Sequence, residues 1–131
     1  VLALGTLASA TYVCSSAIDL SATIPLDVTL EMECNPNGTP SGNKQLILFA
    51  KFSLDNTNWG SGPESGTTAT EEADLHFIGA MPTNDTTDHR TFFSLAGLPV
   101  ARSMKLVVKN DLGVALTSGN VYRADITGAG A

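Results

Sequence analysis

Residues 26–34, LDVTLEMEC, alternate strictly between apolar and polar side chains. In an extended strand, this period of two places every apolar side chain on one face and every polar side chain on the other. A strand with one dry face and one wet face is typical of an antiparallel sheet, because parallel strands are usually covered on both sides. The chain is therefore expected to fold around antiparallel β-structure.

The rest of the chain has the composition of further short strands, separated by turns rich in Gly, Pro and Asn. The run at 45–54 carries apolar side chains on both faces, so it is expected to be covered on both sides. Four more strands are predicted at 75–81, 90–98, 103–110 and 114–117, and a last one at 121–127 after a turn at 118–120. No stretch has a helical period. About eight short strands in 131 residues predict a single all-β domain over residues 9–131, an antiparallel β-sandwich or jelly roll.

Charge and hydropathy narrow the range of functions. Hydrophobic residues make up 43% of the chain and charged residues only 15%, which excludes a disordered acidic tail. The formal net charge of -6 disfavours binding to nucleic acid phosphates. No apolar run approaches the roughly 20 residues of a membrane helix, so no membrane contact is expected. A surface with few charges suits a protein that packs against other proteins.

The first ten residues, VLALGTLASA, contain no charged side chain. They lack the basic start of a secretory signal peptide and are too short for one. An apolar end segment must be covered, since termini are otherwise disordered. Two alternatives follow: residues 1–8 form an arm that docks on a neighbouring subunit, or they form an edge strand tucked onto their own domain. The arm is preferred, with contacts through Val1, Leu2, Leu4 and Leu7, and its deletion is expected to leave the domain folded.

Cys14 and Cys34 both lie in segments that are predicted to be strands. They lack the short paired spacing of a zinc site, and burial as two small apolar side chains is the simpler interpretation. A disulfide between them stays open as an alternative.

The long polar segment 55–74 contains Trp59, the only tryptophan. Loops of this length are usually functional or mobile. Asp55 is expected to support a turn that folds the indole back over the sheet edge, either as a cap on the core or as an exposed anchor for a partner. The turn around Asn84 is the second candidate contact loop.

Catalysis and metal binding find little support in the sequence. There is no Gly-x-Ser-x-Gly elbow, and only His76 and His89 could act as a general base. Asp85, Asp88 and His89 lie close together but lack the spacing of a calcium loop. We therefore expect no enzyme activity, no cofactor and no metal.

Four runs carry a resemblance to a known family: ATYVCSSAIDL, LDVTLEMEC, SGNKQLILFAKFSLDNTNW and MKLVVKNDLGVALTSGNVYRADITG. Together they resemble the cement, or decoration, proteins that coat the outside of tailed-bacteriophage heads. The resemblance implies a jelly-roll virion protein that is assembled in the host cytoplasm. It further implies binding between major capsid subunits on the outer surface, often as a homodimer or other homo-oligomer, to stabilise the expanded head. It implies no catalytic residue.

The alternative is a carbohydrate- or receptor-binding module of a phage tail or fibre, with Trp59 and Tyr122 as stacking surfaces. A small secreted hydrolase that depends on His76 or His89 is the remaining option, and the residues give it the least support.

Overall fold

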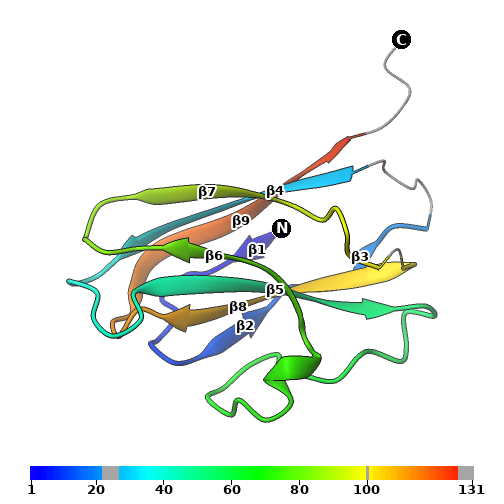
Figure 1. Cartoon of the computed structure of the whole chain (residues 1–131), viewed down its shortest axis with the longest axis horizontal. Coiled ribbons are helices and arrows are strands. Elements are labelled where there is room, and N and C mark those ends of the chain that lie inside the picture. The colour runs from blue at the N-terminus through cyan, green and yellow to red at the C-terminus, as the bar shows by residue number, and fades with distance from the viewer. Residues whose placement is uncertain (22–26, 100, 127–131) are drawn as a thin grey trace.

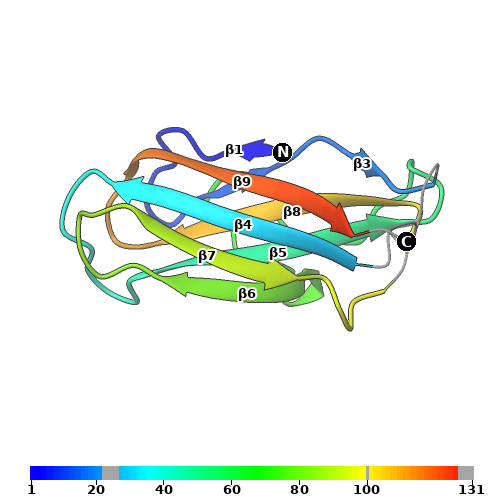
Figure 2. The same cartoon turned by 90° about the horizontal axis from the view of Figure 1, so that it is seen from above.

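Two antiparallel sheets packed face to face form the protein (Figures 1 and 2). The computed structural model describes residues 1–21, 27–99 and 101–126, and these contain nine strands. The four-stranded sheet has the order β1 (Leu2–Ala3), β9 (Leu116–Ile126), β4 (Asp27–Pro36) and β7 (His89–Ser94). The five-stranded sheet has the order β2 (Tyr12–Cys14), β8 (Ser103–Asp111), β5 (Gln45–Ser53) and β6 (His76–Pro82), with β3 (Ile18–Asp19) also paired to β8.

The strand order is that of a jelly roll. When the two-residue β3 is set aside, every connection except that between β5 and β6 crosses from one sheet to the other, in the double Greek-key pattern of that fold. The long pairings join strands that are distant in the sequence, above all β4 with β9 and β5 with β8. The predicted all-β antiparallel sandwich is therefore confirmed, and its more specific jelly-roll form as well.

The core lies between the two sheets, and β4 supplies it as its alternation predicts. Along β4, Val28, Leu30, Met32 and Cys34 are buried, while the intervening polar residues are partly exposed on the outer face. Leu26, the first residue of the predicted strand, lies outside the described residues. In the opposite sheet, β8 and β5 contribute fully buried side chains to this core, which are Leu46, Leu48, Met104, Leu106 and Val108.

The strand β5 is covered on both sides, as its composition predicts. Leu46, Leu48 and Ala50 belong to the core between the sheets. Phe49 belongs instead to a second apolar cluster on the outer side of the five-stranded sheet, together with Tyr12, Leu75 and Val107.

The predicted turn at 118–120 is wrong, because β9 runs without interruption from Leu116 to Ile126. Its Gly119 is paired with Cys34 of β4. A Cβ atom at this position would lie 2.8 Å from the carbonyl oxygen of Glu33 and 3.1 Å from the Leu4 side chain. The glycine therefore permits a close approach of three segments and does not mark a turn. Thr127, the last residue of the strand predicted there, lies outside the described residues.

Within residues 1–8, Leu2–Ala3 form a short edge strand on the chain's own domain, which was the second of the two alternatives for this segment. β1 pairs with β9, with Leu2 opposite Val121. Leu2 and Leu4 are buried in the core between the sheets, and Leu7 packs against it partly buried. The arm is therefore not separate from the domain, because its apolar side chains fill the chain's own core.

Replacing Gly119 with Ala should destabilise the fold, since the added methyl group meets the Glu33 carbonyl and the Leu4 side chain. We expect the free energy of unfolding in urea to fall by about 1–3 kcal/mol. Gly60→Ala is the matched control, because a Cβ there meets nothing within 4 Å. Equal stability of the two variants would contradict the close approach at Gly119.

Leu4→Ala distinguishes a core strand from a docking arm. Because Leu4 is buried in the core, its truncation should lower the free energy of unfolding of the isolated protein by about 2–5 kcal/mol. Leu54, which is 81% exposed, serves as the control, and Leu54→Ala should change stability by less than about 0.5 kcal/mol. An isolated Leu4→Ala variant as stable as the parent would restore the arm interpretation.

Candidate functional site

The two sheets differ in what covers their outer faces. The connection between β5 and β6, residues 54–75, crosses the outer side of the five-stranded sheet (Figure 1). It ends in a short 3-10 helix, Glu72–Asp74. We refer to residues 54–75 as the strap.

The first fixing point of the strap is Glu64. Its carboxylate accepts hydrogen bonds from Lys105 Nζ at 3.0 Å and from Lys51 Nζ at 3.3 Å, and from the Cys14 thiol at 3.3 Å. Lys51 also donates to the Gly62 carbonyl at 3.0 Å. These donors come from β8, β5 and β2, so one carboxylate joins the strap to three strands.

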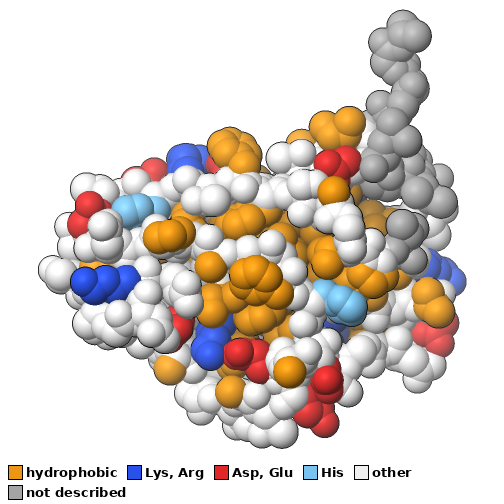
Figure 3. Space-filling model, in the orientation of Figure 1, with side chains coloured by type: hydrophobic (Ala, Val, Ile, Leu, Met, Phe, Trp, Pro, Cys, Tyr) orange, Lys and Arg blue, Asp and Glu red, His pale blue; other side chains and the backbone are white. Residues whose placement is uncertain are grey.

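The second fixing point is Glu72. It accepts a hydrogen bond from Lys109 Nζ at 2.9 Å and another from the Tyr12 hydroxyl. On the side of the molecule seen in Figure 3, a basic and an acidic group lie side by side below the five-stranded sheet. The backbone contributes as well, since the Tyr12 N–H donates to the Gly66 carbonyl at 3.0 Å.

These contacts shift the pKa values of the groups involved. The hydrogen bond from Lys105 is the main cause that lowers the pKa of Glu64 below its usual range. Burial opposes the same change at Glu72, but the hydrogen bonds from Tyr12 and Lys109 outweigh it and lower its pKa. Burial, together with the hydrogen bond to Glu64, raises the pKa of the Cys14 thiol to about 12. Cys14 is therefore a protonated, weakly nucleophilic thiol while the strap is in place.

The strap begins with the turn that the sequence predicted around Asp55. This carboxylate accepts hydrogen bonds from the backbone N–H groups of Asn58 at 2.7 Å and Thr57 at 2.9 Å, and from the Asn58 side chain at 2.7 Å. Trp59 follows, half-buried, with Lys105 Nζ 4.6 Å from its ring centroid. The prediction that Asp55 supports the turn and that the indole folds back over the sheet is confirmed.

The outer face of the four-stranded sheet carries no such cover among the described residues, and Figure 2 looks onto it from above. Phe92 of β7 and Tyr122 of β9 both pair with Glu31 of β4, so the three residues form one row across the sheet. Phe92 is 67% exposed and Tyr122 is 45% exposed. Arg90 Nη1 donates to Glu31 Oε1 at 2.6 Å and holds the carboxylate between the rings. We refer to Phe92, Glu31 and Tyr122 as the aromatic row.

A shallow hollow of about 200 Å³ adjoins the aromatic row, and Thr29, Arg123 and Ala124 complete its lining. Neighbouring strands in a sheet are about 4.8 Å apart, so the backbones of β7 and β9, with β4 between them, are about 10 Å apart. The row is thus a flat surface with two rigid apolar ends and a carboxylate between them.

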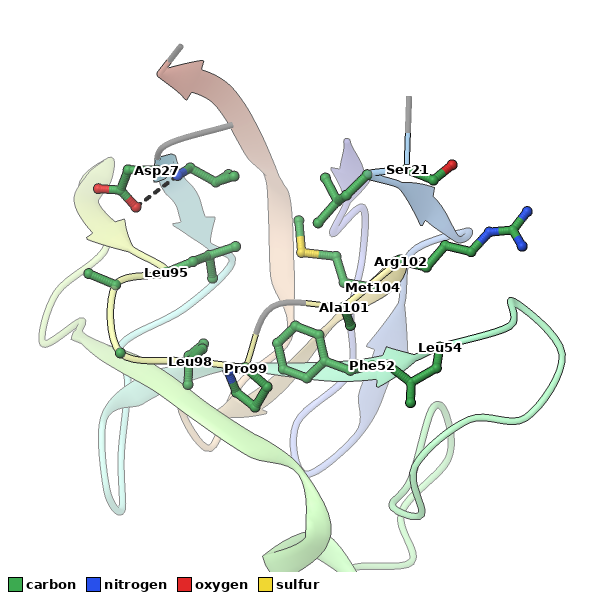
Figure 4. A pocket seen from close by; sticks show the side chains of 14 residues that line it. Ser21, Asp27, Phe52, Leu54, Leu95, Leu98, Pro99, Ala101, Arg102 and Met104 are labelled. Carbon is green, nitrogen blue, oxygen red and sulfur yellow. Dashed lines mark hydrogen bonds between the residues drawn. The ribbon is translucent and has the colours of Figure 1, made fainter. Parts of the chain in front are cut away.

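A larger cavity of about 570 Å³ opens at one end of the sandwich. Figure 4 shows Leu95 and Leu98 on one side of it, opposite Met104 and Phe52. Arg102 lies at the rim and points away from the cavity. The Asp27 carboxylate, also at the rim, already accepts hydrogen bonds from Ser94 and from the Val28 N–H. The described residues of the lining are mostly apolar and suit an apolar group.

The six residues predicted as partner contacts do not form one surface. Leu2 and Leu4 are in the core, Leu7 is half-buried and Val1 is exposed at the edge of the four-stranded sheet. Trp59 belongs to the strap over the other sheet. Asn84 is exposed in the turn between β6 and β7.

Phe92 was missed as a contact residue. The adjacent pair Phe92 and Phe93 was a usable signal, because successive side chains in a strand point to opposite faces. One ring of such a pair must point outward. Phe93 packs against the core, and Phe92 is the exposed one.

The residues considered for chemistry are engaged locally. His76 packs edge-on against Phe52, with ring centroids 5.0 Å apart. His89 Nε2 lies 2.9 Å from Asp85, and Asp88 contacts Arg90 at 3.5 Å. Cys14 and Cys34 are both free thiols. Within the described ranges, no group of three His, Cys, Asp or Glu residues is arranged to hold a metal ion, and no helix is long and apolar enough to cross a membrane.

Comparison of the chain with protein-family models and with curated proteins finds no match to either.

Asp55→Ala should release the turn that positions Trp59, because it removes the acceptor of the Asn58 and Thr57 N–H groups. Trp59 is the only tryptophan, so its fluorescence emission should shift to longer wavelength and become more accessible to acrylamide. Asp85→Ala is the control, since Asp85 closes a similar turn between β6 and β7. An unchanged spectrum in Asp55→Ala would show that Lys105 alone positions the indole.

Proposed function

We propose that this protein is a structural, non-enzymatic jelly roll that binds the outer surface of a tailed-phage capsid between major capsid subunits and stabilises the expanded head. The observation that carries the proposal is the difference between its two outer faces. The strap covers one face, whereas the other is open and carries the aromatic row. We assign the capsid contact to this open face.

The aromatic row has the properties of an interface anchor. Aromatic residues are enriched among the few side chains that dominate binding energy. Phe92 and Tyr122 lie on two strands that both pair with β4, and the Arg90–Glu31 contact fixes the β4 residue between them. A rigid surface of this kind loses little conformational entropy on binding.

The fold and the charge support the same proposal. Jelly rolls occur in viral capsid proteins, lectins and cupins, so the fold is compatible with a virion protein without selecting it. An acidic chain avoids the packaged nucleic acid and favours a protein partner. Binding to the expanded lattice alone would stabilise that lattice by mass action. Association as a homodimer or other homo-oligomer on the capsid is part of the proposal, as the family resemblance implies.

A carbohydrate-binding module is the second candidate, and the hollow beside the aromatic row favours it. Stacking rings with a carboxylate between them could hold a sugar by its apolar face and its hydroxyl groups. The pairing of Trp59 with Tyr122 is not suited to this role, because the strap places Trp59 over the opposite sheet. In this candidate Phe92 replaces Trp59 as the partner of Tyr122.

The aromatic row is tested by co-sedimentation with undecorated phage heads. Phe92→Ala and Tyr122→Ala should each weaken binding about tenfold or more, because both remove exposed anchor surface. Phe77→Ala is the matched control, since Phe77 is an aromatic residue of similar exposure on the other sheet. It should bind as the parent does.

The parent protein should bind heads saturably and at a fixed ratio to the major capsid subunit. Parent protein that does not bind heads but is retained by a glycan array, with loss in Phe92→Ala, would support the carbohydrate module. Equal head binding by all three variants would overturn the assignment of the contact to the four-stranded sheet.

A further inference from the structure

We infer that the strap detaches as one unit from the outer side of the five-stranded sheet while the sandwich stays folded. Acid favours this detachment. Its opening would uncover a second apolar surface, formed by Tyr12, Phe49 and Val107. This inference does not depend on the proposed capsid binding.

The apolar side chains beneath the strap are separate from the core. Tyr12, Phe49, Leu75 and Val107 form a cluster of their own on the outer side of the sheet. Leu75 is the only one of the four that the strap itself contributes. The core between the sheets has its own buried set, from Leu2 to Val121, so opening the strap leaves that set covered.

Polar contacts at Glu64 and Glu72 hold the strap at two places, against Lys105 and Lys109 of β8. Glu64 faces Lys51 of β5, Lys105 of β8 and Cys14 of β2. Glu72 faces Lys109 of β8 and Tyr12 of β2. Lys51 is only 5% exposed, so its ammonium group depends on Glu64 and on the Gly62 carbonyl for its partners.

Charge balance links the two places. Three lysines of the sheet face two glutamates of the strap. If one glutamate is neutralised, its lysines are left without a counter-charge, and a buried ammonium group is costly in that state. Water must then enter beneath the strap, which also weakens the contacts of the other glutamate.

The direction of the pH effect follows from the glutamates. Both have a pKa below the ordinary value of 4.5 while the strap is closed. The stabilisation of the closed strap is therefore complete above that value and is lost as the pH falls through the lowered values. Burial and the hydrogen bond to Glu64 raise the pKa of the Cys14 thiol, and, against the effect of burial, the hydrogen bond to Glu72 raises the pKa of Lys109, so neither group titrates over this range or opposes the change.

The two free thiols distinguish opening of the strap from unfolding of the whole domain. Cys14 lies beneath the strap against Glu64, and Cys34 is buried in the core between the sheets. The experiment measures the reaction of both thiols with 4,4′-dithiodipyridine, which reacts down to acidic pH. Mass spectrometry follows each cysteine separately, and the rates are referred to those of the unfolded chain at the same pH.

Glu72→Gln is the decisive variant, because Glu72 faces Lys109 and Tyr12 and makes no contact with Cys14. If the strap opens as a unit, Cys14 should react about tenfold faster in this variant at pH 7 while Cys34 stays protected. Glu71→Gln is the control, because the neighbouring Glu71 is exposed. It should leave both rates unchanged. The parent protein should show the same selective increase at Cys14 when the pH is lowered below about 4.

Three outcomes would overturn the inference. Equal protection of Cys14 and Cys34 under all conditions would show that the strap opens only when the whole domain unfolds. A Cys14 rate unaffected by Glu72→Gln would show that the two glutamates act independently. Cys14 reactivity in the parent equal to that of the unfolded chain would show that the strap gives no cover. If Glu72→Gln unfolds the domain and so exposes Cys34, Lys109→Gln is used in its place. It removes the Lys109–Glu72 ion pair by changing the sheet residue, and the same rates of Cys14 and Cys34 decide the result.

Discussion

The apolar layer between the two sheets is the interaction on which the rest of the structure depends. It contains the inward-facing side chains of the long strands, including the alternate residues of β4 and Met104, Leu106 and Val108 of β8. It also takes up the N-terminal segment, because Leu2 and Leu4 close the layer beside β9. With the inner faces occupied in this way, only the outer faces and the two ends of the sandwich remain for binding.

The two outer faces differ because their strands have different residue patterns. The outer side of β4 is polar and can face water, so the four-stranded sheet needs no cover. The outer side of β5 and β8 carries Phe49 and Val107, and an apolar surface there requires a covering segment. The strap provides that cover, and its glutamates pair with lysines that border the apolar cluster. The assignment of function to the open sheet and of a conformational role to the covered one follows from this difference.

Local patterns predicted much of the fold, and contacts between distant residues account for most of the failures. The alternation of residues 26–34 and the doubly apolar run at 45–54 predicted β4 and β5, because each pattern is set by the strand's own period. Gly119 was wrongly predicted to mark a turn. A glycine is needed there because Leu4 and Glu33 approach it closely, and both residues are too distant in the sequence to appear in a local pattern.

The aromatic row and the contacts of the strap were harder to predict for the same reason. The aromatic row exists only because β7 and β9 both pair with β4, and the partners of Glu64 and Glu72 lie on three other strands. The Asp55 turn, by contrast, was predictable because its acceptor and donors are within three residues of one another. The N-terminal segment was compatible with an arm or an edge strand. An apolar run must be covered, but its sequence does not show whether its own domain or another molecule covers it.

The strap also affects how the molecule interacts with others at long range. It encloses Lys51, Lys105 and Lys109, which are three of the seven basic residues, against two glutamates. The remaining surface is thus slightly more negative than the formal net charge of -6 suggests. Wherever many copies stand side by side with the strap outward, they would form a polyanionic layer that repels similar layers over about one Debye length, roughly 8 Å at physiological ionic strength. The ion pairs that hold the strap would then keep such particles apart in dilute salt. Added salt would screen the repulsion and allow them to approach one another.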